Sequence, residues 1–435
     1  MSLPVAVQRY LEKRALTHPW RIEGALRHDY RGAVVIPALA ESAHLFATLA
    51  SLQANPASVL EEFLVVVVVN QRQDAAASDK QDNDLTLRKL RESLGFLPHL
   101  GWVDAAADGL ELPGKGGVGL ARKIGLDLVL QRLDWAAGPI LANLDADTLV
   151  RDDYLPALKA HFAIAEAGGA VVPFCHPVTG EKAQQQAMIA YELYLRGHVL
   201  GLQWAGSPYA FHTVGSTMVC RADDYVRSGG MNRRQAGEDF YFLQQLAKTS
   251  GVGGVVDTVV YPSARISQRT PFGTGRSVAQ LASDGSAPRL YYDPRCYEML
   301  HDWLQLVSAH WQTDGGEILE QAGVISELLA GFLRKENFQE TWPRLCRNHA
   351  DRQSRLKAFH GWFDGLKTTR LIHYLTDAGW PRQAAAEAIA PLLRRVGLPA
   401  VDEPQKQLML LRQRQIGTPC ASCRLSEKSN CCRVA

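Results

Sequence analysis

The sequence lacks any hydrophobic run long enough to cross a membrane. Its longest uninterrupted apolar stretch, residues 63–69, contains seven residues, whereas a membrane-spanning helix needs about 20. The N-terminal segment is amphipathic and mixed in charge, without the long apolar centre and the small-residue cleavage site of a secretory signal. We therefore expect a cytoplasmic protein without a transmembrane segment.

The chain also lacks an excess of charge of either sign. Its 435 residues include 47 Lys and Arg against 45 Asp and Glu, and 46% of the residues are hydrophobic. This composition is typical of globular proteins and argues against a disordered or a nucleic-acid-coating chain. We expect no nucleic-acid partner, and about two or three domains at roughly 150 residues each.

Cysteine is sparse except near the C-terminal end. Four of the eight cysteines are scattered singly, as is usual for buried thiols in a reducing compartment. The other four lie in CASCRLSEKSNCC within the last sixteen residues. Four thiolates could bind zinc, but the second pair is adjacent rather than spaced and no histidine assists. A flexible, exposed terminus is the favoured interpretation.

From about residue 30 to 260, short apolar runs alternate with helical patterns, which predicts a mainly parallel sheet wrapped by helices. Residues 32–38 and 63–69 are rich in β-branched side chains that do not alternate with polar ones, as in strands buried on both faces. The pattern predicts further strands over 99–105, 138–145 and 167–174, and helices over 41–55, 119–133 and 155–166.

Beyond about residue 285 the pattern is helical. Apolar residues recur at spacings of three and four over residues 317–333, which predicts one helix with a buried stripe formed by Ile318, Leu319, Ala322, Ile325, Leu329 and Phe332. We therefore expect three parts: an α/β domain over 1–284 with a short N-terminal helix, a helical subdomain over 285–415, and a Cys-rich tail over 416–435.

Two carboxylates, Asp145 and Asp147, stand directly behind one of the apolar runs. Ligands of open α/β sheets bind at the carboxyl ends of the strands. Carboxylate oxygens suit Mg²⁺ or Mn²⁺, and such ions are usually shared with substrate phosphates. The D-x-D thus predicts a metal-bridged diphosphate; a surface turn is the alternative, because aspartate is common where a strand stops.

A second acidic pair, Glu238 and Asp239, follows a double glycine and opens an amphipathic helical pattern in which Phe242 and Leu246 face inward. Acidic residues in a first helical turn also complement the helix dipole and need no further role. The pair acquires a functional interpretation only in combination with the other segments.

Five segments together resemble, in order and spacing, the family 2 glycosyltransferases of the GT-A fold: VVIPALAES, LVVVVVN, KGGVGLARKIGLDLVL, LANLDADTLV and STMVCRADDYVRSGGMNRRQAGEDFYFLQQLAK. The resemblance covers roughly residues 30–280. It implies a Rossmann-like, mainly parallel sheet flanked by helices. It also implies transfer of a sugar from a nucleotide-diphosphate sugar to an acceptor hydroxyl with inversion at the anomeric carbon.

The resemblance implies a role for each matched residue. Asp147 would ligate Mn²⁺ or Mg²⁺, with Asp145 as its partner toward metal or ribose. Asp239 would be the catalytic base, with Glu238 beside it. Contacts to the nucleotide sugar would come from Pro37, Ala38, Glu41, Asn70, Arg122, Asp145 and Arg269.

The chain departs from the family pattern at two places. The second strand ends in Asn70, where relatives usually have aspartates. Residues 261–278 contain no histidine, although many relatives have a metal-ligating one there. This segment instead offers Arg265, Arg269 and Arg276, whose planar guanidinium groups suit phosphate oxygens.

Several alternatives remain open on the sequence. A nucleotidyltransferase would use similar carboxylates, and a catalytically silent module would use the helical part to recruit a partner. A phosphate-binding loop in KGGVGLARK is disfavoured, because the G-K-[ST] continuation is absent. Tyr191, Tyr194, Trp204 and Tyr209 either stack on a sugar or fill a core. The acceptor could be a saccharide, a lipid-linked compound or a small molecule.

Overall fold

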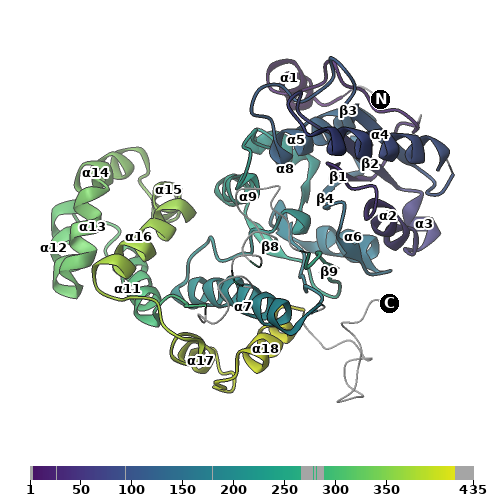
Figure 1. Cartoon of the computed structure of the whole chain (residues 1–435). Coiled ribbons are helices and arrows are strands. Elements are labelled where there is room, and N and C mark those ends of the chain that lie inside the picture. Colours follow the sequence, from purple (N-terminus) through teal and green to yellow (C-terminus); the bar gives the residue numbers. More distant parts are fainter. Residues whose placement is uncertain are drawn as a thin grey trace. The chain divides into compact units, whose positions relative to one another are not determined.

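The computed structural model describes residues 3–25, 27–93, 95–178, 180–265, 278, 281 and 289–416. The chain forms two compact units (Figure 1). One contains residues 1–179, 213–279 and 413–435, and the other contains residues 180–212 and 280–412. Arg269, Arg276 and the four C-terminal cysteines lie outside the described residues.

The first unit is built on a seven-stranded sheet with the strand order β3-β2-β1-β4-β7-β6-β8. Strands β3, β2, β1 and β4 are parallel neighbours, β7 is antiparallel to β4 and β6, and β8 is parallel to β6. The mainly parallel α/β class is therefore confirmed. The strands are β1 Gly32–Ala38, β2 Phe63–Asn70, β3 Leu100–Ala105, β4 Ile140–Asn143, β6 Gly169–Val171, β7 Met218–Arg221 and β8 Val252–Gly254.

Every residue of β1 and β2 is buried, because helices cover both faces of this sheet. Helix α5 packs directly on these strands at Gly125, where a Cβ atom would lie 2.5 Å from Val35 Cγ1 and 2.8 Å from Val68 Cγ2. The helices of this unit are α1 Val5–Lys13, α2 Leu45–Gln53, α3 Ala57–Leu60, α4 Ala77–Glu92, α5 Val118–Val129, α6 Tyr154–Ile164, α8 Ala222–Ser228 and α9 Glu238–Thr249.

A separate two-stranded ribbon lies beyond the end of β4. Strand β5 (Leu149–Val150) pairs antiparallel with β9 (Val260–Tyr261), so that Leu149 opposes Tyr261. This pairing brings the chain that follows β9 back to the D-x-D segment that precedes β5. The ribbon is therefore the element that places Arg265 beside Asp147.

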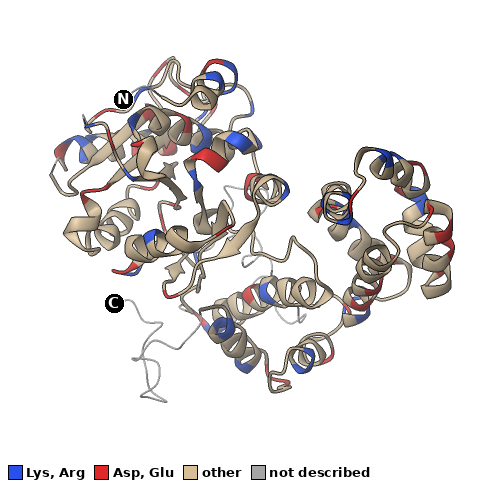
Figure 2. Cartoon of the chain, turned by 180° about the vertical axis from the view of Figure 1, so that it is seen from behind, with Lys and Arg blue, Asp and Glu red and all other residues tan. Residues whose placement is uncertain are grey.

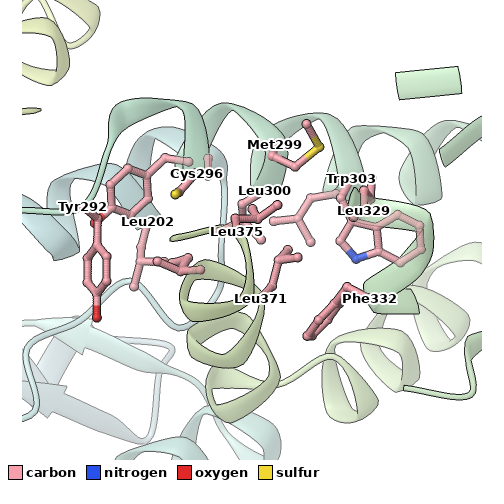
Figure 3. Close-up of a cluster of buried hydrophobic side chains, with 14 of the residues drawn as sticks. Leu202, Tyr292, Cys296, Met299, Leu300, Trp303, Leu329, Phe332, Leu371 and Leu375 are labelled. Atoms are coloured by element: carbon pink, nitrogen blue, oxygen red, sulfur yellow. The ribbon is translucent and has the colours of Figure 1, made fainter. Parts of the chain in front are cut away.

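The second unit is helical, as the sequence predicts for the chain beyond residue 285. Its aromatic core surrounds Trp303, whose ring packs edge-on against Phe338, Phe359 and Phe363 at centroid distances of 5.1, 5.7 and 6.0 Å. Figure 3 shows Trp303 in the wider apolar cluster. The helices are α7 Lys182–Ala205, α11 Pro294–Ala309, α12 Gly315–Ile325, α13 Glu327–Lys335, α14 Phe338–Asn348, α15 Arg352–Trp362, α16 Gly365–Ala378, α17 Ala385–Arg395 and α18 Pro404–Ile416.

The single helix predicted over 317–333 is wrong, because the chain forms two helices there. Ser326 has an extended backbone, with φ −166° and ψ 129°, and its side chain accepts a hydrogen bond from the Leu328 backbone N–H. Serine is a favoured N-cap, so it starts α13 instead of continuing α12. Ile325, assigned to the buried stripe, is 38% exposed, whereas Leu329 and Phe332 are buried.

Within the described part of the chain, no helix combines the length and the apolar character needed to span a membrane. Figure 2 shows basic and acidic residues interspersed along the helices of both units. This distribution agrees with the near-neutral formal net charge of +2.

Candidate active site

The loop after β4 presents both carboxylates of the D-x-D on one side. Leu144 and Ala146 are buried, so Asp145 and Asp147 alternate with them toward the more open side. The Leu144 N–H donates to the Val35 carbonyl of β1 at 3.1 Å. The Thr48 hydroxyl of α2 donates to the Ala146 carbonyl at 2.9 Å. The D-x-D lies in a turn, closed by the Thr148 N–H that donates to the Asp145 carbonyl at 3.1 Å, and neighbours on both sides hold this turn in place.

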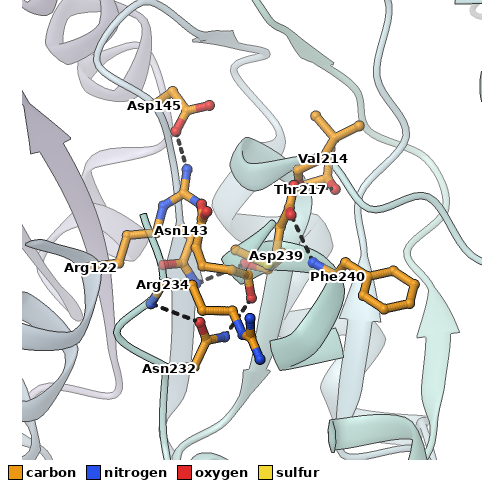
Figure 4. A network of polar contacts seen from close by, with 11 residues as sticks. Arg122, Asn143, Asp145, Val214, Thr217, Asn232, Arg234, Asp239 and Phe240 are labelled. Atoms are coloured by element: carbon orange, nitrogen blue, oxygen red, sulfur yellow. Dashed lines mark hydrogen bonds and ion pairs between the residues drawn. The ribbon is translucent and has the colours of Figure 1, made fainter. Parts of the chain in front are cut away.

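Arg122 joins the two acidic pairs. This α5 residue is only 2% exposed, and its guanidinium forms an ion pair with Asp145 (Figure 4). It forms a second ion pair with Glu238 at 2.6 Å. Burial opposes the charge of the guanidinium, but Asp145, Glu238 and Asp239 raise the pKa of Arg122. One buried guanidinium therefore bridges Asp145 of the D-x-D and Glu238 of the second acidic pair.

Glycines make room for this arrangement. A Cβ atom on Gly119 of α5 would lie 2.5 Å from the Arg234 carbonyl oxygen and 2.8 Å from Glu238 Cβ. A Cβ atom on Gly215 would collide with the Arg122 guanidinium. Gly119 of the KGGVGLARK segment and Gly215 are explained by these close approaches.

Helix α9 begins at the acidic pair. Gly237, at φ 70°, precedes it in a left-handed conformation that glycine adopts without strain. The Asn232 side-chain amide donates to the Glu238 carbonyl at 2.8 Å, which fixes the entering loop. The Asp239 carboxylate accepts the Phe240 backbone N–H at 2.7 Å. Phe242 and Leu246 are buried, as the helical pattern predicts.

The two carboxyls of this pair have raised pKa values. Burial, followed by the charge of Glu238, raises the pKa of Asp239 to about 7. Burial also raises the pKa of Glu238, although Arg122 acts in the opposite direction. A carboxylate whose pKa lies near neutrality is well suited to accept a proton during a reaction at that pH.

Arg265 holds the other end of the carboxylate cluster. Its Nε donates to Asp147 Oδ2 at 2.8 Å, and its Nη2 pairs with the buried carboxylate of Glu41. Burial and the nearby Asp145 raise the pKa of Asp147, while Arg265 lowers it. The sequence predicts a nucleotide-sugar contact for Arg269 of the same segment, which lies outside the described residues. The pairing of β5 with β9 is what brings Arg265 to Asp147.

The described cluster carries more acidic than basic groups. Five carboxylates, Glu41, Asp145, Asp147, Glu238 and Asp239, accompany the two guanidinium groups of Arg122 and Arg265. Hard oxygen donors in excess are the chemistry that Mg²⁺ and Mn²⁺ bind. Among the described residues no three His, Cys, Asp or Glu side chains form a complete metal cage. The cluster matches sites in which one or two carboxylates and a substrate phosphate share the ion.

The remaining predicted residues lie at the carboxyl ends of neighbouring strands. Pro37 and Ala38 end β1, and Asn70 ends β2. The Asn70 side-chain amide donates to the carbonyls of Ala38 and Val68, both at 3.0 Å. Asn70 therefore ties the ends of β1 and β2 together.

Sequence reasoning missed Asn143, the last residue of β4. This side chain is 1% exposed, and its Oδ1 has no hydrogen-bond partner among the described residues. The Nε of Arg122 is likewise buried without a partner there. Figure 4 shows both side chains within the same network. Asn143 could have been identified from the sequence by its position at the end of β4, two residues before Asp145.

The sequence matches no protein-family model and no curated protein. Among solved structures it is similar to S. aureus TarS 1–349, with 13% identity, a TM-score of 0.37, and coverage of 78% of this chain and 92% of that chain. It is also similar to S. aureus TarS 1–349 in complex with UDP-GlcNAc, with 14% identity, a TM-score of 0.35, and coverage of 89% and 88%. The mannosyltransferase PcManGT from Pyrobaculum calidifontis, in complex with GDP-Man and Mn²⁺, has 16% identity, a TM-score of 0.37, and coverage of 94% and 92%.

Proposed function

We propose that the chain is a glycosyltransferase of the family 2, GT-A type that acts on a cytoplasmic nucleotide-diphosphate sugar and passes the sugar to an acceptor hydroxyl. The observation that carries this proposal is the bridging of Asp145 and Glu238 by the buried Arg122. It supports a single site in which one acidic pair binds the metal at the leaving diphosphate and the other accepts the proton of the attacking hydroxyl.

On the donor side, Asp147 and Asp145 would hold Mn²⁺ or Mg²⁺. When bound, the ion supplies Lewis-acid neutralisation of the departing diphosphate. Arg265, already paired with Asp147, offers forked N–H donors to the same phosphate oxygens. The excess of carboxylates over guanidinium groups supports the need for this added positive charge, because a diphosphate brings further negative charge of its own.

On the acceptor side, Asp239 is the base. It takes the proton from the acceptor hydroxyl, whose oxygen forms a bond to the anomeric carbon as the bond from that carbon to the diphosphate oxygen breaks. The nucleoside diphosphate leaves, and in-line attack inverts the anomeric configuration. The pKa of about 7 for Asp239 supports this role, since the group changes its protonation state near neutral pH.

The strand ends supply the remaining surface for the nucleotide. Pro37, Ala38, Glu41 and Asn70 would contact the nucleoside, and Arg122 would act by holding Asp145 and Glu238 in place. Arg269 is proposed as a further phosphate contact from the segment that follows Arg265. The predicted catalytic domain 1–284 would act through its segments 1–179 and 213–279, because helix α7 within it belongs to the helical unit. Residues 285–415 would form a helical subdomain, and 416–435 a tail.

The experiment that tests this function is product analysis after incubation with UDP-, GDP- and dTDP-sugars and Mn²⁺. We expect slow release of nucleoside diphosphate and free sugar with one of these donors, water acting as the acceptor. The variant Asp239→Asn should release none, whereas the control Asp302→Asn, an exposed aspartate of α11, should retain wild-type release. Pyrophosphate as the product would instead identify a nucleotidyltransferase, and no turnover of any donor would contradict the proposal.

A further inference from the structure

The helical unit contains a polar-aromatic cluster that the proposed catalytic site does not use. Tyr194 of α7 and Tyr292, just before α11, have ring centroids 5.8 Å apart, and the Tyr194 hydroxyl donates to the Tyr292 hydroxyl at 3.1 Å. Figure 3 shows Tyr292 at the edge of the apolar cluster, with its hydroxyl pointing away from the other labelled side chains. The two tyrosines therefore mark the boundary between the core and a polar surface.

An isolated backbone bridge brings a third segment to this boundary. Tyr291 and Gln383 exchange two backbone hydrogen bonds of 2.8 Å, so their neighbours Tyr292 and Arg382 lie side by side. The Arg382 guanidinium carbon lies 4.7 Å from the centroid of the Tyr292 ring, and Nη2 donates to the Tyr292 hydroxyl at 3.3 Å.

The Tyr292 hydroxyl is fully engaged by its neighbours. It accepts from Tyr194 and Arg382, and it lies 2.7 Å from His373 Nε2. Burial and the charge of Arg382 lower the pKa of His373, which favours a neutral imidazole whose Nε2 accepts a hydrogen bond from the Tyr292 hydroxyl. The positive charge of the cluster thus comes from arginine and not from histidine.

A second arginine lies over the other tyrosine. The Arg289 guanidinium carbon lies 4.1 Å from the Tyr194 ring centroid, and Arg289 Nε is buried without a hydrogen-bond partner in the described part of the chain. Neither Arg289 nor Arg382 forms an ion pair with a described carboxylate. Arg295 and Arg412 of the same unit, by contrast, bind Asp293 and Glu192. Two guanidinium groups therefore flank one tyrosine pair, and neither forms an ion pair within the described ranges.

We propose that Arg289, Arg382 and the Tyr194–Tyr292 pair form a binding site for the phosphate or carboxylate group of a sugar or polyol derivative. Guanidinium forks bind such oxyanions through paired hydrogen bonds. The partly exposed ring of Tyr194 adds apolar surface for the carbons of a sugar or polyol. This site does not rest on the proposed function.

Calorimetric titration of the full chain tests the site directly. Glycerol 3-phosphate and glucuronate are the charged probes, and glycerol and glucose are their uncharged counterparts. We expect binding of a charged probe but not of its counterpart. Arg289→Ala and Arg382→Gln should each weaken that binding at least tenfold. The control Arg334→Ala, which removes an exposed partner of Glu327 in the same unit, should leave it unchanged.

The outcomes separate this site from the proposed function. If the wild type binds neither charged probe, or if Arg334→Ala weakens binding as much as Arg382→Gln does, the inference is overturned. Thermal unfolding of each variant shows whether it is folded, and Arg382→Gln retains side-chain donors for Tyr292. Release of nucleoside diphosphate to water should be unchanged in the Arg289 and Arg382 variants. If the wild type releases no nucleoside diphosphate but still binds the charged probe through the two arginines, the proposed function is refuted and the anion site is supported.

Discussion

The protonation of Asp239 should set the pH dependence of the reaction. Its pKa lies at about 7 because burial and the charge of Glu238 disfavour the carboxylate. A base must be ionised to accept a proton, so kcat/KM should rise with pH and reach half of its plateau near pH 7. One pH unit below the pKa only about a tenth of the carboxyl is ionised, so activity at pH 6 should be about a tenth of the plateau.

Two substitutions should move this profile in opposite directions. Glu238 raises the pKa of Asp239 and Arg122 lowers it, so Glu238→Gln should shift the acid limb to lower pH and Arg122→Gln to higher pH. Charges in contact move a carboxyl pKa by about one to three units, and a shift of about one pH unit is the expected size. The assay measures release of nucleoside diphosphate between pH 5 and 9, at saturating and at subsaturating concentrations of the donor.

Protein stability must be measured over the same pH range. A carboxyl whose pKa is higher in the folded than in the unfolded chain binds more protons when folded between about pH 4 and 7, so its ionisation lowers stability as pH rises through 7. Asp239→Asn should remove this loss, which thermal unfolding at pH 6 and 8 would show. A wild-type profile that stays flat from pH 5 to 8, or shifts of the same sign in Glu238→Gln and Arg122→Gln, would refute the reasoning.

Other predictions concern the groups that hold the cluster together. Arg122→Met should destabilise the protein by about 3–5 kcal/mol, because it leaves buried carboxylates unpaired; urea unfolding measures this loss, and an unchanged midpoint would contradict it. Arg265→Ala should weaken binding of the free nucleoside diphosphate about tenfold, as expected for losing a charge-assisted contact, and equal calorimetric affinities would argue against that contact. Removal of divalent ions with EDTA should weaken the same binding in the wild type but not further in Asp147→Asn; equal sensitivity of both proteins would exclude the metal role. Gly125→Val should cost about 1–3 kcal/mol through overpacking against the sheet, measurable by thermal unfolding, and a neutral effect would contradict the close approach of α5.

The sheet could be predicted because its signal is local. Residues 32–38 and 63–69 are β-branched and apolar throughout, and the structure buries all of β1 and β2. The acidic pair at 238 could be placed at a helix start because glycine precedes it and buried apolar residues follow at helical spacing. The strand predicted over 138–145 is too long, because β4 ends at Asn143.

Features that depend on long-range contacts could not be predicted in this way. Arg265 reaches Asp147 only because β5 pairs with β9, and these two-residue strands have no distinctive sequence pattern. Nothing in the local sequence indicates that Arg122 is buried between two acidic pairs. The periodicity of residues 317–333 correctly predicts helix on both sides of Ser326. The capping hydrogen bond of Ser326 starts a new helix there, so the chain forms two helices instead of one.

The central claim is tested most directly by two measurements on the same variants. One is calorimetric binding, with Mn²⁺, of the nucleotide sugar that the wild type hydrolyses, and the other is the turnover of that donor. The account predicts that Asp147→Asn loses donor binding, whereas Asp239→Asn binds the donor with wild-type affinity and releases no nucleoside diphosphate. Wild-type donor affinity in Asp147→Asn, or wild-type turnover in Asp239→Asn, would contradict the claim that the two acidic pairs serve one reaction.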